Sequence, residues 1–178
     1  MAAQGLVDFF NRNLTDPATQ TVYHAPVSLP SGQGVEGANF TAGLFLIQSD
    51  QLQLIATTSF QEGAGAGFFV PVYNVQVPGK LPGDSATFRA RVWETAAGSY
   101  QNAIATGRYY GEFLTTSGSP LVEIDRLGTL PLPEGLVMPN MSGIQSLTLI
   151  PEPSLLTLLG FATAFLLITT AGFKRTNA

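Results

Sequence analysis

Hydrophobic and polar residues alternate with a period of two along much of the first 150 residues of this chain. The alternation is clearest from Ala86 to Glu94. One face carries Ala86, Phe88, Ala90 and Val92, and the opposite face carries Thr87, Arg89, Arg91 and Trp93. Because successive side chains of a β-strand point to opposite faces, this pattern predicts a strand with one side in a core.

Two apolar runs, residues 40–47 and 52–56, lie close together and predict a β-hairpin. Ser49-Asp50 between them is the expected turn, since both residue types favour turns. Shorter strands are expected at residues 6–11, 21–27, 73–77, 109–115, 121–124 and 146–150. Residues 128–143 contain several prolines and are expected to link the earlier strands to the last one.

Only one stretch predicts a helical turn, residues 99–105. Ser99 stands where a residue that caps the start of a helix is needed, and Gly107 stands where a helix would end. The chain has 19 Gly and 12 Pro, while only 11% of its residues are charged, a composition typical of a turn-rich β protein. About eight or nine short strands with polar connections predict an antiparallel β-sandwich in residues 1–150.

The end of the chain carries a different pattern. Every residue from Leu155 to Phe173 is uncharged, and Lys174 and Arg175 follow. As a helix that rises ~1.5 Å per residue, this segment is roughly 28 Å long, close to the ~30 Å hydrocarbon core of a bilayer. We therefore expect one transmembrane helix; a buried helix of a soluble domain is disfavoured because no apolar stripe is present. The two stop-transfer charges place the C-terminus in the cytoplasm and residues 1–150 across the membrane.

Immediately before the apolar segment lies Pro151-Glu152-Pro153. The two prolines disfavour a helix, so this tripeptide is expected to be extended and accessible to a protease. A Pro-Glu-Pro box, an apolar helix and a short basic tail, in this order, resemble the PEP-CTERM sorting signal of Gram-negative bacteria. The resemblance implies recognition of Pro151, Glu152 and Pro153 by an exosortase, a membrane-embedded protease, and transfer to the cell surface or exopolysaccharide matrix. The alternative is a plain C-terminal membrane anchor.

The sequence thus divides into an ectodomain, residues 1–150, and a sorting signal, residues 151–178. Met1-Ala2-Ala3-Gln4 has neither the basic nor the apolar region of a signal peptide. Ala2-Ala3-Gln4 is similar to the end of such a leader, so we expect the sequence to begin near the mature N-terminus. A start assigned downstream of the true one is the alternative. Either origin fits an exported protein held first in the inner membrane.

The charge and the cysteine content of the chain limit which classes of partner and which kinds of site it can have. The chain has eight Lys and Arg and twelve Asp and Glu. Two of the basic residues are Lys174 and Arg175, so residues 1–154 keep six basic side chains against all twelve acidic ones, a net charge near −6. A phosphate backbone would be repelled, which argues against nucleic acid. Without cysteine, disulfides, thiolate metal sites and cysteine nucleophiles are excluded.

Candidate catalytic residues are sparse. His24 is the only histidine, too few for a multi-histidine zinc site, and no Gly-x-Ser-x-Gly motif accompanies it. Glu123 and Asp125 would share a face of a strand, and paired carboxylates can serve a glycosidase, but acidic residues are scattered through the chain. We expect no catalytic residue, no cofactor and no metal site. A small surface hydrolase is the least favoured function.

Trp93 is the strongest candidate for ligand binding, because it shares a strand face with Arg89 and Arg91. An aromatic ring among cations can form a platform on which a sugar stacks. Tyr100, Tyr109 and Tyr110 could extend this platform. The interpretation that we favour over this platform is that Trp93 covers the second sheet or a long loop and that the tyrosine hydroxyls form hydrogen bonds at strand edges.

A second resemblance covers most of residues 5–153. The residues that carry this resemblance are Val7, Phe9 and Asn11, the stretches 37–42, 89–93 and 98–100, and Gly107-Arg-Tyr-Tyr-Gly-Glu112. They are similar to a β-rich group of PEP-CTERM surface proteins, which implies a shared β fold and no assigned activity. The expected function is that of a non-enzymatic surface or matrix protein sorted by its C-terminal signal. The alternative is a carbohydrate-binding module for exopolysaccharide.

Overall fold

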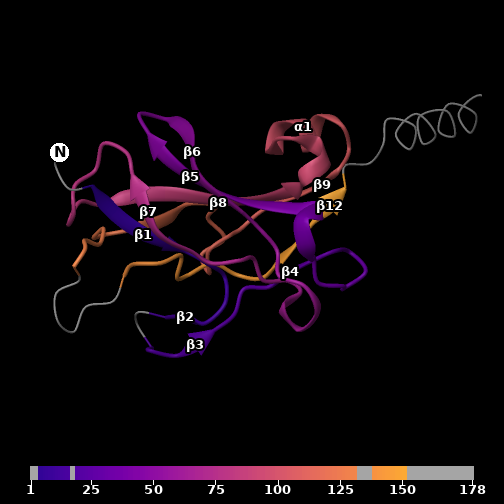
Figure 1. Ribbon diagram of the computed structural model, residues 1–178, viewed down its shortest axis with the longest axis horizontal. Coiled ribbons are helices and arrows are strands. Elements are labelled where there is room, and N and C mark those ends of the chain that lie inside the picture. Colours follow the sequence, from indigo (N-terminus) through magenta and orange to yellow (C-terminus); the bar gives the residue numbers. More distant parts are fainter. Residues whose placement is uncertain (1–3, 17–18, 132–137, 152–178) are drawn as a thin grey trace, which may run out of the picture.

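The computed structural model describes residues 4–16, 19–131 and 138–151, and these residues are mainly β (Figure 1). One short α-helix, α1, spans Tyr100–Ala105, and three 3₁₀ turns are η1 (Gly37–Asn39), η2 (Gly63–Gly65) and η3 (Thr95–Ala97). The strands are β1 (Gly5–Phe9), β2 (Leu14–Thr15), β3 (Val22–Tyr23), β4 (Val27–Ser28), β5 (Phe40–Gln48), β6 (Gln51–Ser59), β7 (Val72–Val77), β8 (Ala86–Glu94), β9 (Tyr109–Glu112), β10 (Val122–Ile124), β11 (Leu147–Thr148) and β12 (Ile150–Pro151). The mainly β class is confirmed.

The largest sheet has six antiparallel strands: five lie in the order β12-β9-β8-β5-β6, and the sixth, β10, pairs with β8 beside this path. Its central strand is β8, which pairs with β5 on one side. On its other side, β8 pairs with β10 along its first half and with β9 along its second half. Three two-stranded units complete the described fold: antiparallel β1-β7 and β2-β3, and parallel β4-β11.

The predicted strand at Ala86–Glu94 is β8 with the same bounds. Its inward face is buried as expected, and Phe88 is one of the largest fully buried side chains. Val7 of β1 and Val77 of β7 belong to the same buried cluster, so the β1-β7 pair packs on the inward face of the large sheet. Alternation in the sequence therefore located the main core.

The hairpin turn and the helical turn are confirmed as well. Ser49 and Asp50 have φ of 50° and 61°, the left-handed conformation that a two-residue hairpin turn requires. Ser99 Oγ accepts a hydrogen bond from the backbone N–H of Asn102 at 3.1 Å, which caps α1. Gly107 after the helix has φ of 65°, a conformation in which a side chain is disfavoured.

Two single strands predicted at residues 21–27 and 146–150 are wrong, because each of these stretches forms two short strands. The first is divided into β3 and β4 at Pro26, which has no N–H to donate to a ladder. The second is divided into β11, which pairs with β4 as far as Thr148, and β12, which pairs with β9. These two divisions, together with the unpredicted strand β2, bring the strands of the described ranges to twelve, above the expected number.

Within residues 4–16, 19–131 and 138–151, no helix combines the length and apolarity needed to span a bilayer. The predicted transmembrane helix from Leu155 to Phe173 lies outside the described residues. Glu152, Pro153, Lys174 and Arg175 lie outside them too.

Candidate functional site

Trp93, the predicted centre of the sugar platform, is buried with only 4% of its surface exposed. It belongs to a second buried cluster with Phe45, Tyr100 and Ala103, formed where α1 covers the outward face of the large sheet. The indole lies over Gly43: a Cβ at that position would be 2.7 Å from ring atoms Cη2 and Cζ3 of Trp93. This interior packing leaves no ring face for a sugar, which counts against a platform on Trp93.

Arg91, beside Trp93 on the same face, is also buried. Its Nε donates to Glu112 Oε1 at 2.8 Å, and its guanidinium carbon lies 4.5 Å from the ring centre of Tyr100 and 5.3 Å from that of Phe45. Burial, and then the nearby Glu112 carboxylate, raise the pKa of Tyr100 to about 12, so its hydroxyl stays protonated at neutral pH. Arg91 and Glu112 thus form a hydrogen-bonded ion pair, and the Arg91 guanidinium also packs against two aromatic rings.

The two remaining platform residues point to opposite sides of β9. Tyr110 is paired with Trp93 across the ladder and makes an edge contact with Tyr100 at 5.7 Å between ring centres. Tyr109 packs against the main core beside Phe40. The structure thus brings together Trp93, Tyr100 and Tyr110, but as packed side chains beneath and beside α1.

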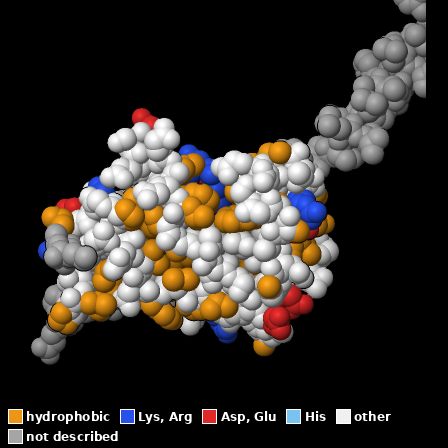
Figure 2. Space-filling model, turned by 45° about the horizontal axis from the view of Figure 1, so that its top comes forward, with side chains coloured by type: hydrophobic (Ala, Val, Ile, Leu, Met, Phe, Trp, Pro, Cys, Tyr) orange, Lys and Arg blue, Asp and Glu red, His pale blue; other side chains and the backbone are white. Residues whose placement is uncertain are grey.

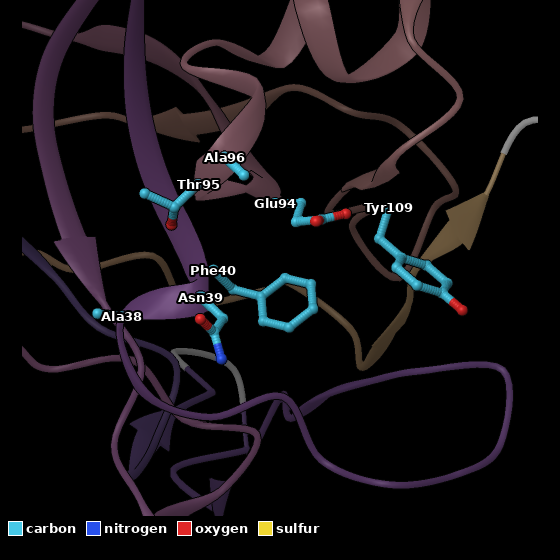
Figure 3. A pocket seen from close by; sticks show the side chains of 7 residues that line it. All are labelled: Ala38, Asn39, Phe40, Glu94, Thr95, Ala96 and Tyr109. Atoms are coloured by element: carbon cyan, nitrogen blue, oxygen red, sulfur yellow. The ribbon is translucent and has the colours of Figure 1, made fainter.

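Tyr109 instead lines a small open cavity of about 440 Å³ at the end of β8 (Figure 3). Its walls are Ala38, Asn39, Phe40, Glu94, Thr95, Ala96 and Tyr109. Figure 3 shows the Phe40 ring between Asn39 and the Glu94 carboxylate. Because Glu94 accepts a hydrogen bond from Arg108, its carboxylate is already paired, and this cavity offers little catalytic chemistry.

The larger opening, which we call the Tyr73 groove, has a volume of about 970 Å³. It is lined by Asp8, Phe10, Arg12, Asn13, Thr15, Gln20, Gln61, Pro71, Tyr73, Glu123, Ile124, Asp125, Arg126, Met138, Pro139, Asn140 and Ser142. Tyr73 is 63% exposed, and its ring centre lies 6.2 Å from that of Phe10. An accessible aromatic pair is thus surrounded by carboxylates, amides and guanidinium groups.

Asp8 and Asn140 sit together within this groove. Asp8 Oδ1 accepts from the backbone N–H of Asn74 at 2.8 Å, and the Asp8 N–H donates to Pro139 O at 2.8 Å. Burial raises the pKa of the Asp8 carboxyl, and the Asn74 hydrogen bond offsets part of the rise. The Oδ1 atom of Asn140 is buried and has no hydrogen-bond partner, a free acceptor that a water or a ligand hydroxyl would satisfy.

Sequence alternation missed Tyr73 because a β-bulge changes its direction. Strict alternation would place Tyr73 on the same face as Val75 and Val77, which are buried, but Tyr73 is exposed. The β1-β7 register runs from Val7↔Val75 to Phe9↔Val72, so two residues of β7 stand opposite one residue of β1. Asn74 within the bulge has φ of 57°, which interrupts the alternation. An Asn in a short β run was the one available signal, since Asn tolerates this conformation.

The other sequence candidates are separate from the groove or lie at its rim. His24 is exposed; its Nδ1 accepts from the Asn13 N–H at 3.0 Å, and its ring lies edge-on to Phe68. Glu123 and Asp125 are both exposed on the groove wall. Among the residues that the structure describes, no three His, Asp or Glu side chains meet in a way that could hold a metal ion.

Pro151 is the one member of the Pro-Glu-Pro box that the structure describes. It ends β12, an exposed two-residue strand at the edge of the large sheet, where it stands opposite Tyr109. Comparison of the chain with protein-family models, curated proteins and solved structures returned no match.

Proposed function

We propose that this chain is a non-enzymatic protein of the bacterial cell surface or extracellular matrix. Its ectodomain, an antiparallel β-sandwich within residues 1–150, is exported and held in the inner membrane by the segment from Leu155 to Phe173. An exosortase-type protease then acts near Pro151, Glu152 and Pro153. The observation that carries this proposal is the three-part order of Pro-Glu-Pro, uncharged segment and basic tail.

The position of Pro151 supports access by a protease. A protease binds its substrate as an extended chain with free backbone groups, and β12 is an extended, exposed edge strand. Pro151 has no N–H to hold the strand in the ladder, so few bonds would have to break before the chain enters an active site.

Replacing Pro151, Glu152 and Pro153 together by alanine is expected to abolish release of the ectodomain and leave the full chain in the membrane fraction. The physical reason is that alanine removes both the carboxylate and the two prolines that keep this segment extended. The measurement is mass spectrometry of the chain isolated from the native host, with Ser154→Ala as the adjacent control, which should still be processed. An intact C-terminus on the wild-type protein at the cell surface would contradict processing and leave only a membrane anchor.

A second candidate function, binding of a neutral exopolysaccharide, is favoured by the Tyr73 groove. Sugar rings stack their C–H faces on exposed aromatic rings, and their hydroxyls bond to carboxylates and amides. Tyr73 supplies the ring, while Asp8 and Asn140 supply acceptors. Because residues 1–154 carry a net charge near −6, a polyanionic glycan would be repelled, so the expected ligand is neutral.

The Tyr73→Ala variant should bind neutral polysaccharide about tenfold more weakly than the wild type, which corresponds to ~1.4 kcal/mol of lost stacking. Tyr73→Phe keeps the ring and should retain binding. The measurement is affinity electrophoresis in gels that contain dextran, mannan, β-glucan or the polyanion alginate. Val22→Ala is the matched control, because Val22 is also 63% exposed but lies outside the groove. Equal retardation of Tyr73→Ala and wild type, or retardation by alginate alone, would argue against this candidate.

A further inference from the structure

The edge strand β6 presents an open ladder to solvent. It is the outermost strand on one side of the large sheet, and the β5-β6 hairpin lies at the margin of the fold (Figure 1). Gln51–Ser59 contains no charged residue and no proline, two of the means by which an edge is protected from pairing, and its bulge at Ile55 lies beyond the stretch Gln51–Leu54. On the face that Figure 2 shows, hydrophobic side chains are widespread and few charged ones lie among them.

Among the described residues, the chain closes only the far end of this edge. The Val70 N–H donates to Ser59 O at 2.8 Å, and Thr58 Oγ1 donates to Val70 O at 2.8 Å. No described strand other than β5 pairs with β6. The regular open part therefore begins at Gln51 and ends at Leu54, before the bulge at Ile55, and these four residues are all exposed.

The hairpin register identifies the backbone groups that are free. Gln48 pairs with Gln51 around the two-residue turn, and such a closing pair exchanges both of its hydrogen bonds. Hydrogen-bonded and non-hydrogen-bonded pairs alternate in an antiparallel ladder, so Gln53 also bonds toward β5. Leu52 and Leu54 then direct their N–H and C=O groups away from β5. Their side chains are 39% and 47% exposed.

The opposite edge of the sheet is blunted. It is formed by two short strands, β12, which has two residues and ends in Pro151, and β10, which has three residues and pairs with the first half of β8. A partner strand that needs N–H donors has little to bind there. Growth of the sheet is therefore expected at the β6 edge alone, and the association that uses one edge of each copy is a closed twofold dimer.

We propose that two copies of this chain pair antiparallel along β6, with the twofold axis at Gln53. Leu52 of each copy then faces Leu54 of the other in a hydrogen-bonded pair, and the two Gln53 residues face each other in a non-hydrogen-bonded pair. This register satisfies the free backbone groups of both leucines and covers their exposed side chains with one contact. The absence of charge in β6 means that the two identical strands do not repel each other.

A contact confined to two edge strands is expected to bury less than the ~1,200 Å² of a standard stable complex, so the dimer should depend on concentration. This inference does not rest on sorting or glycan binding. A different protein that adds a strand at the same edge would also satisfy the backbone, but it would not produce the self-pairing geometry at Gln53.

Because the chain has no cysteine, a single introduced cysteine tests the register in the full-length protein. In Gln53→Cys, the two cysteines would stand in a non-hydrogen-bonded pair with Cα atoms ~4.5 Å apart, within the reach of a disulfide. Mild oxidation of the full chain in detergent micelles should give a species of twice the chain mass on a non-reducing gel.

Two control variants distinguish cross-linking in the proposed register from cross-linking in another register or by random collision. In Gln51→Cys, each cysteine would face Ile55 of the partner copy, so the two sulfur-bearing residues would be about 13 Å apart along the strands, too far for a disulfide. Gln76→Cys places an exposed cysteine on β7 and measures random collision. Both should give little dimer. Adding Leu54→Lys to Gln53→Cys should also suppress the dimer, because it brings positive charges into the pairing edge.

Cross-linking of Gln53→Cys no stronger than that of Gln76→Cys would overturn the proposal. Stronger linking by Leu54→Cys than by Gln53→Cys would overturn the register, and undiminished linking in the Leu54→Lys background would overturn pairing through this edge. Circular dichroism of each variant, matched to the wild type, shows that the fold is retained.

Discussion

Replacing Trp93 by alanine is expected to lower the free energy of unfolding by about 3–5 kcal/mol, the usual cost of removing a large buried aromatic side chain. Trp93 is the largest member of the cluster that α1 and the outward sheet face enclose, so its loss leaves a cavity between them. The measurement is urea unfolding of the full chain in detergent micelles, followed by far-UV circular dichroism. Tyr73→Ala is the control; it truncates an exposed aromatic and should change stability by less than about 0.5 kcal/mol.

A double-mutant cycle with Gly43 makes this prediction sharper. Gly43→Ala should cost about 1–3 kcal/mol in the wild type, since its new Cβ would overlap the Trp93 ring. In the Trp93→Ala background the ring is absent, and most of this cost should disappear. A Trp93→Ala variant as stable as Tyr73→Ala would mean that Trp93 is exposed in solution, and the sugar platform would again be a candidate.

Asn11→Ala should destabilise the protein by about 2 kcal/mol, because it leaves the buried Ala25 C=O and Phe69 N–H without a partner, each worth ~1 kcal/mol or more, while Gly67 O keeps its hydrogen bond from the Val27 N–H. Asn11 is fully buried. Its Nδ2 donates to Ala25 O at 2.9 Å and to Gly67 O at 3.0 Å, and its Oδ1 accepts from the Phe69 N–H at 3.1 Å. One carboxamide thus joins three chain segments.

The control for Asn11 is Asn39→Ala, which truncates an exposed asparagine and should remain within about 0.5 kcal/mol of the wild type. Both variants are compared by the same urea unfolding. Asn11→Asp should be at least as harmful as Asn11→Ala, since a carboxylate cannot donate to the two carbonyls that Nδ2 binds. Equal stability of Asn11→Ala and Asn39→Ala would contradict the assigned role.

The inward half of the fold could be predicted because local rules and tertiary packing agree there. The alternation of β8 defines its buried face, Ser49-Asp50 supplies the conformation of the hairpin turn, and Ser99 supplies the helix cap. Each signal is short in range and is not altered by distant residues. These features therefore follow from sequence alone.

A second sheet or a loop was expected to cover Trp93, and that α1 covers it instead could not be predicted, because this helix lies elsewhere in the chain. Alternation alone places Arg91 and Trp93 on the face opposite the buried residues, yet α1 folds back over them. Room for the indole comes from Gly43, on the neighbouring strand β5 and far away in sequence. Tyr73 departs from alternation in the opposite sense, since a bulge at Asn74 turns it away from the face that Val75 and Val77 share. Alternation describes one strand, whereas burial depends on what packs against it.

The Tyr73 groove could not be predicted for the same reason, since it is formed by segments that are distant in sequence. Its walls come from β1, β7, β10 and the stretch after Met138, which the chain brings together only when folded. No contiguous motif contains these residues. Sequence reasoning could identify the acidic pair Glu123 and Asp125, but it had no signal that would place Asp8 and Tyr73 beside them.

Trp93 is the only tryptophan of the chain, and it lies under α1 rather than in the main core. Its intrinsic fluorescence is therefore a local optical reporter of how firmly that helix is docked on the outward face. Undocking of α1 would move the emission toward the red while the sheet signal in circular dichroism stays constant. Separation of the two signals during unfolding would show that the outer layer opens before the sheet beneath it.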